Sequence, residues 1–62
     1  MKAKDLKPGM RYRHDNVIVE VKMIERITDK AITYRTKRIS PDFYDGNFFN
    51  RKSLDTEITI IN

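Results

Sequence analysis

The stretch RYRHDNVIVEVK, residues 11–22, decides the fold because two runs of alternating side chains flank a pair of turn-forming residues. In its first four residues two arginines alternate with a tyrosine and a histidine, which is the two-residue period of a β-strand. Asp15 and Asn16 tolerate the left-handed backbone conformation that two-residue hairpin turns use. The stretch therefore predicts a β-hairpin that carries both arginines on one face.

The second strand of this hairpin and one further strand are predicted next. Residues 17–24 are rich in β-branched side chains and repeat with a period of two, but both faces of this run are partly apolar. That pattern indicates a central strand, or one whose facing switches at a bulge near Glu25 and Arg26. Residues 28–30 are typical of a turn, and residues 31–37 predict a third strand whose even-numbered side chains share one face.

The carboxy-terminal third is the least regular part of the sequence. Ser40-Pro41 interrupts strand pairing, and Asp45-Gly46 predicts a tight hairpin within residues 43–49. The segment NRKSLD, residues 50–55, can form one short 3₁₀ turn. The segment TEITII, residues 56–61, predicts a last strand.

Four or five short strands joined by tight turns favour an all-β fold, a small SH3-like antiparallel barrel with one short 3₁₀ turn before the last strand. An OB-like barrel is the weaker alternative because it usually needs more residues and often a helix. We expect a single domain, residues 1–62, and the absence of Cys leaves no disulfide to support it. A compact apolar core must therefore stabilise the fold.

About half of the chain, DLKPGMRYRHDNVIVEVKMIERITDKAITYRTK at residues 5–37, carries a family resemblance. It resembles the first three strands of SH3-like domains of the KOW group and of the amino-terminal domain of translation elongation factor P. Those domains also have a short leader, a turn glycine and two long hairpin-paired strands in this order, although Asp15-Asn16 stands where their hairpin turn has glycine. The resemblance implies an SH3-like fold and nucleic-acid or ribonucleoprotein partners, and it assigns no site residue.

Positive charge is concentrated in the first two thirds of the chain. The formal net charge is +4, with 11 Lys or Arg against 5 Asp or Glu in residues 1–38 and 2 against 4 in residues 39–62. If the first three strands pair as a meander, one face gathers a cationic stripe that can follow a phosphate backbone. We therefore expect non-enzymatic binding to DNA or RNA, with low sequence specificity, through Arg11, Arg13, Lys22, Arg35, Lys37 and Arg38. The alternative is a solvated outer face whose charges discourage aggregation.

The segment of residues 39–50 supports a second function, docking onto a protein. It holds four aromatic residues, of which we expect at least two to enter the core and the others to anchor a partner, with Phe43, Tyr44 and Phe49 as candidates. The protein would then be a small accessory module, such as a host-directed regulator of a phage or mobile element, that docks through this segment or an exposed strand edge. A homodimer paired through residues 56–61 is a further alternative to a monomer.

Enzymatic activity has little support in the residue types. His14 beside Asp15 is the one imidazole and carboxylate pair, and adjacent strand residues point to opposite faces. With no Cys and a single His, we expect no nucleophilic centre, no metal site and no cofactor. The sequence has no stretch of about 18 apolar residues and no apolar leader, so we expect a cytoplasmic protein without a membrane partner.

Overall fold

The computed structural model describes residues 1–61, which form one antiparallel sheet of five strands. A short 3₁₀ turn comes first, and the elements are η1 (Ala3–Asp5), β1 (Arg11–His14), β2 (Val17–Ile27), β3 (Ala31–Ser40), β4 (Tyr44–Ser53) and β5 (Ile60–Ile61). Their order across the sheet is β4-β3-β2-β1-β5. The predicted all-β class of a small single domain is confirmed, and the last residue of the predicted domain, Asn62, lies outside the described residues.

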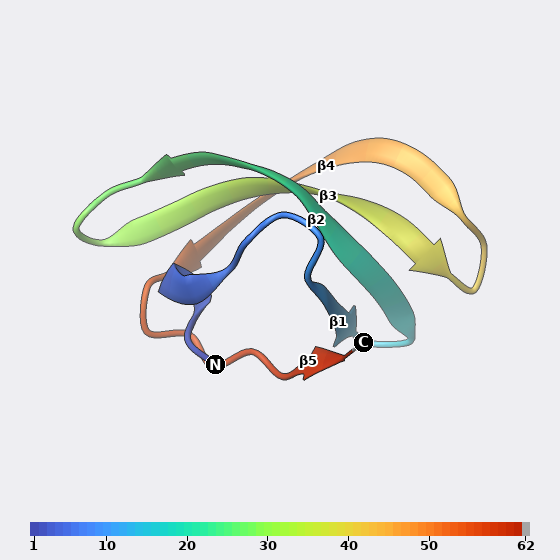
Figure 1. Ribbon diagram of the computed structural model, residues 1–62, viewed down its shortest axis with the longest axis horizontal. Coiled ribbons are helices and arrows are strands. Elements are labelled where there is room, and N and C mark those ends of the chain that lie inside the picture. The colour runs from blue at the N-terminus through green and yellow to red at the C-terminus, as the bar shows by residue number, and fades with distance from the viewer. Residues whose placement is uncertain (62) are drawn as a thin grey trace.

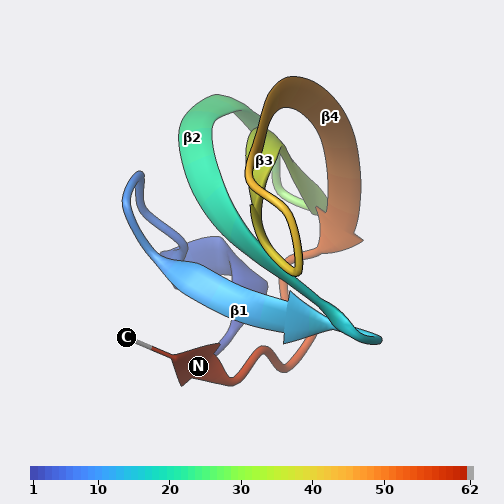
Figure 2. The ribbon, with the colours of Figure 1, turned by 90° about the vertical axis from the view of Figure 1, so that its right-hand side faces the viewer.

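The sheet curls strongly without closing. Figures 1 and 2 both show β2, β3 and β4 arching over β1. Within residues 1–61, β4 pairs with β3, β5 pairs with β1, and these two outer strands do not pair with each other. The predicted closed barrel is therefore not confirmed. The observed architecture is an open, curved sheet with a convex face and a concave face.

The first hairpin forms as the sequence predicts. His14 pairs with Val17 across the two-residue turn, and Asp15 takes a positive φ of 54°. Tyr12 is buried between exposed arginines at positions 11 and 13, so the alternation of side chains in β1 is also confirmed. The buried tyrosine anchors β1 to the core, while both arginines face solvent.

The curvature of the sheet comes with irregular pairing between β2 and β3. The register shifts between Ile18 and Val19, between Val21 and Met23, and between Ile24 and Arg26. A β-bulge bends its strand and increases the local twist, so three of them curl this hairpin. The last irregularity confirms the bulge predicted near Glu25 and Arg26.

The core lies on the concave side of the sheet, between the long strands and the two ends of the chain. Ile32, Tyr34 and Thr36 of β3 share one face as predicted, and all three are almost fully inaccessible, with Ile32 and Tyr34 in the apolar core cluster. The other members of the core cluster come from both termini and from β1 and β2, and they are Ala3, Leu6, Tyr12, Val21 and Ile58. The ends of the chain therefore supply much of the apolar surface that the long hairpins bury.

The prediction of a hairpin at Asp45-Gly46 is wrong, because β4 continues through both residues. The chain reverses earlier, between β3 and β4, around residues 41–43. Thr36 of β3 pairs with Phe48, whereas Arg38 pairs with Tyr44, so two steps along β3 match four steps along β4. The extra residues form a bulge within the strand, which takes up the turn-forming Asp-Gly pair without reversing the chain.

The two predictions for residues 50–61 also need correction. The segment 50–55 forms no 3₁₀ turn, because its first four residues extend β4, and the 3₁₀ turn is η1 near the amino terminus. The predicted last strand, residues 56–61, is shortened to Ile60–Ile61. Glu57 forms an isolated bridge with Lys2, and the backbone nitrogen of Ile58 donates to the carbonyl of Met1 at 2.8 Å. The segment thus divides its pairing between the amino terminus and β1.

Candidate functional site

The predicted cationic stripe is carried by the convex face of the sheet, where carboxylates interrupt it. Arg11, Glu20 and Lys37 lie side by side on three neighbouring strands. The Arg11 Nε donates to Glu20 Oε1 at 2.8 Å, and the Lys37 Nζ lies 3.3 Å from the other carboxylate oxygen. The hydrogen bond from Arg11 lowers the pKa of the Glu20 carboxyl, with Lys37 adding to the effect. Glu20 therefore compensates two of the predicted phosphate-binding cations.

Two more of the predicted cations are also paired on this face. The Lys22 Nζ lies 2.9 Å from Asp45 Oδ1, and its hydrogen bond lowers the pKa of the Asp45 carboxyl. Arg35 forms an ion pair with Glu25. Four cations of the stripe thus face three carboxylates, which leaves the centre of the convex face close to neutral.

The other two cations of the predicted stripe, Arg13 and Arg38, are not part of this network of ion pairs. Arg13 is exposed and lies on the convex face by alternation with the buried Tyr12. Arg38 pairs across strands with Val19, which faces the concave side, so Arg38 belongs to the concave face. Its Nε donates to the carbonyl of Asp42 at 3.0 Å. The structure therefore does not gather all six predicted cations on one surface.

The aromatic residues of positions 43–49 all remain exposed, so the prediction that at least two enter the core is wrong. Phe43 is 64% exposed, Tyr44 54%, Phe48 43% and Phe49 61%. The core needs none of these rings, because the two tyrosines at positions 12 and 34 and the apolar residues of the chain termini fill it. This small protein consequently presents an unusual amount of aromatic surface to solvent.

A row of exposed apolar and cationic side chains crosses the convex face. Met23, Arg35 and Phe49 are cross-strand neighbours on β2, β3 and β4, and Met23 is 48% exposed. The Arg35 guanidinium lies 5.8 Å from the centroid of the Phe49 ring, and the Lys37 ammonium lies 5.7 Å from that of Phe43. We call these five residues the convex patch.

The sequence pattern did not predict the place of Met23 in this row. Strict alternation groups Met23 with Val17, Val19 and Val21 on one face. The irregularity between Val21 and Met23 adds one residue, so Val21 is buried in the core and Met23 faces out. A bulge inside a continuous β-branched run has no clear signature in a single sequence.

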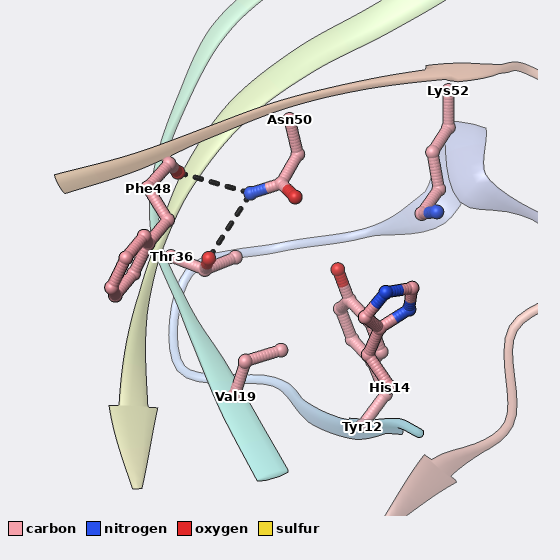
Figure 3. Close-up of a pocket in the computed structure, with 7 residues that line it drawn as sticks. All are labelled: Tyr12, His14, Val19, Thr36, Phe48, Asn50 and Lys52. Carbon is pink, nitrogen blue, oxygen red and sulfur yellow. Dashed lines mark hydrogen bonds between the residues drawn. The ribbon is translucent and has the colours of Figure 1, made fainter. Parts of the chain in front are cut away.

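The concave face holds a cleft of about 240 Å³ beside the core (Figure 3). It lies between β1 and β4, with β2 and β3 forming its floor. The residues that line it are Tyr12, His14, Val19, Thr36, Phe48, Asn50 and Lys52. Tyr12 belongs to the core cluster and Thr36 is buried, and none of the seven is one of the predicted site residues. We call this feature the concave cleft.

Hydrogen bonds fix two of the polar groups around the concave cleft. The Asn50 Nδ2 donates to Thr36 Oγ1 and to the carbonyl of Phe48, both at 3.0 Å, and Figure 3 shows the Asn50 Oδ1 on the other side of the amide. The hydroxyls of Tyr12 and Tyr34 lie 2.7 Å apart, and burial raises the pKa of both phenols. The Lys52 side chain extends from β4 toward His14 across the cleft (Figure 3).

Aromatic surface extends the concave cleft along β4. The ring centroids of Tyr44 and Phe48 are 5.7 Å apart, and the guanidinium of Arg38 lies 5.7 Å from the Tyr44 ring. Gly46 lies beneath this pair, where a Cβ would come within 2.5 Å of a Tyr44 ring carbon. The glycine therefore gives room for the two rings to lean together over the strand.

The remaining groups give little basis for chemistry. The turn brings His14 Nε2 within 3.8 Å of Asp15 Oδ2, but both side chains are exposed. Among residues 1–61, no three His, Asp or Glu side chains are grouped so that they could hold a metal ion. None of the helical segments in the described part of the chain is long and apolar enough to cross a membrane. Comparison with protein families, curated proteins and solved structures finds no match for the chain.

Proposed function

We propose that this protein is a non-enzymatic interaction module that docks onto a partner protein through the convex patch. The carrying observation is the exposure of Met23, Phe43 and Phe49 on one face of a 62-residue protein. Exposed apolar side chains gathered on one face are costly to leave in water and typically mark an interaction site.

The composition of the convex patch also fits a protein interface. Interface cores are enriched in aromatic residues, Met and Arg, and the row of Met23, Arg35 and Phe49 contains one of each. Arg35 is held between the Glu25 carboxylate and the Phe49 ring, so little side-chain entropy remains to be lost on binding. These features support a preorganised anchor for a partner.

Binding of nucleic acid through the same face is the weaker proposal. The carboxylates of Glu20, Glu25 and Asp45 lie among the four cations that would hold phosphate. A phosphate approaching this face would be repelled by those carboxylates or would have to displace them from their partners. Of the predicted cations on this face, Arg13 alone has no carboxylate partner within residues 1–61.

We further infer that the fold is an open form of the predicted SH3-like barrel. Four strands form a meander, and β5 returns to pair with β1. Pairing of the two edge strands, β4 and β5, would close this sheet into a five-stranded barrel. This interpretation adds no site residue. It places the convex patch on the outer surface of such a barrel and the concave cleft at the open seam.

The docking proposal is tested by retention of a partner from nuclease-treated lysate of the source organism on the immobilised protein. Phe49 and Phe48 are adjacent on β4 and face opposite sides of the sheet, so Phe49→Ala and Phe48→Ala are a matched pair. We expect a stoichiometric partner that Phe49→Ala loses and Phe48→Ala keeps. The absence of any nuclease-resistant partner, or equal loss with both variants, would refute the proposal.

A further inference from the structure

We propose that the concave cleft binds single-stranded nucleic acid, with one base in the cleft and its phosphates along the cationic rim. This inference does not depend on the docking proposal, because it concerns the opposite face of the sheet. It moves nucleic-acid binding away from Arg11, Lys22, Arg35 and Lys37, whose charges are compensated by carboxylates.

The charge of the concave cleft differs from that of the convex face. Its seven lining residues include Lys52 and His14 and no carboxylate. Glu57 lies in the adjoining hollow, 3.6 Å from the amino-terminal ammonium of Met1, and Asp15 is 3.8 Å from the His14 ring. Within residues 1–61, neither Lys52 nor Arg38 forms an ion pair, so the Lys52 ammonium and the Arg38 guanidinium are both available to an anion.

The aromatic surface is arranged for stacking of bases. Phe48 lines the cleft and remains 43% exposed, and the Tyr44 ring continues the surface along β4. Arg38 lies against Tyr44 at one end of this surface, and Lys52 extends into the cleft at the other. Aromatic faces flanked by cations are how proteins hold single strands without reading their sequence.

The size of the cleft sets what can enter it. Pockets for drug-sized ligands begin at about 300 Å³, and the concave cleft measures about 240 Å³. A single planar base matches this space better than a whole nucleotide, so sugar and phosphate would remain on the rim. The Asn50 amide nitrogen is already committed to Thr36 and Phe48, which leaves its Oδ1 to accept a hydrogen bond from a base.

The test is fluorescence anisotropy with a labelled oligo(dC) of about 12 nucleotides, titrated with the protein at low and near-physiological salt. Lys52 and Arg51 are adjacent on β4 and face opposite sides, as do Phe48 and Phe49, which gives two matched pairs. We expect binding that weakens steeply with salt. Lys52→Glu and Phe48→Ala should each weaken it about tenfold, whereas Arg51→Glu and Phe49→Ala should change it less than about twofold.

Several results would overturn the proposal. One is the absence of binding at low salt, and another is an equal loss for Arg51→Glu and Lys52→Glu, which would make the effect one of net charge. Circular dichroism of every variant separates loss of binding from loss of folding, and Phe48→Ala provides a second route if Lys52→Glu fails to fold. A protein partner from lysate that Phe48→Ala loses and Phe49→Ala keeps would assign the cleft to a protein instead.

Discussion

The hydroxyl groups of Tyr12 and Tyr34 lie 2.7 Å apart and connect β1 to β3 across the intervening β2. Tyr34 is fully buried and Tyr12 almost so, and burial raises the pKa of both phenols. Both groups therefore stay protonated at neutral pH, with one donating to the other. This hydrogen bond joins the β1 wall of the concave cleft to the buried core.

Removing both of these hydroxyls should cost less stability than the sum of the two single removals. Tyr12→Phe leaves the Tyr34 hydroxyl buried without a partner, which costs about 1–3 kcal/mol. In the double variant Tyr12→Phe/Tyr34→Phe neither orphaned hydroxyl remains, so we expect its loss of stability to be smaller than the sum of the single losses. Urea unfolding of the four proteins measures the difference, and strictly additive losses would contradict it.

The Glu20 carboxylate should make stability depend on pH in the acid range. Its pKa is lower in the folded protein than its ordinary value of 4.5, chiefly because Arg11 donates a hydrogen bond to it. A carboxyl whose pKa is lowered by folding stabilises the protein above its unfolded pKa, and the stabilisation is lost as pH falls through the folded pKa.

Glu20→Gln should therefore be less stable than the unmodified protein at neutral pH, by no more than about 1 kcal/mol because the pair is near the surface. The gap should narrow between neutral pH and about pH 3, because the stabilisation is lost as the pH falls through the folded pKa. Urea unfolding of both proteins at the two pH values measures it. Asp29→Asn, in the turn between β2 and β3, is the control, and a gap for Glu20→Gln that persists in acid would be inconsistent with the ion pair.

The turn residue Asp15 should respond to backbone conformation more than to charge. Its φ of 54° lies in the left-handed region, where a Cβ costs about 1 kcal/mol and glycine pays nothing. Asp15→Gly and Asp15→Ala both remove the carboxylate, so comparing them isolates the backbone effect. We expect the glycine variant to be more stable by about 1 kcal/mol in urea unfolding. Equal stability would show that the turn relaxes.

The two glycines should differ in what an alanine disturbs. Gly9 has a φ of 93° with open space around its Cβ position, so Gly9→Ala should lose about 1 kcal/mol of stability through backbone strain. At Gly46 the obstacle is the exposed Tyr44 ring, which can swing away. Gly46→Ala should therefore change stability little and separate Tyr44 from Phe48. Loss of the nuclear Overhauser contacts between the two rings measures this, and their persistence would contradict it.

Much of the sheet follows from local sequence. The hairpin at Asp15-Asn16 and the buried face of β3 could be predicted because the side chains of neighbouring residues alternate with a period of two. The Asp45-Gly46 pair has an equally strong local signal for a turn, yet it lies in a bulge of β4. The pairing of Phe48 with Thr36 and of Tyr44 with Arg38 overrides that signal, and no local pattern contains those partners.

The candidate sites were harder to predict than the strands. Alternation places Arg11, Arg35 and Lys37 on one face correctly, but it does not reveal that Glu20 lies between two of them. That arrangement depends on the register of three strands. The concave cleft depends on the curl of the whole sheet, so its lining residues, such as Phe48 and Lys52, share no sequence motif.

The register irregularities of β2 have a consequence for the concave cleft. Within residues 1–61 its two walls, β1 and β4, are not hydrogen-bonded to each other, and β2 and β3 lie between them in the sheet. The distance between the two walls therefore depends on how strongly the β2–β3 hairpin beneath them is bent. Straightening β2 at the step from Val21 to Met23 would move β1 and β4 apart without altering any residue that lines the cleft.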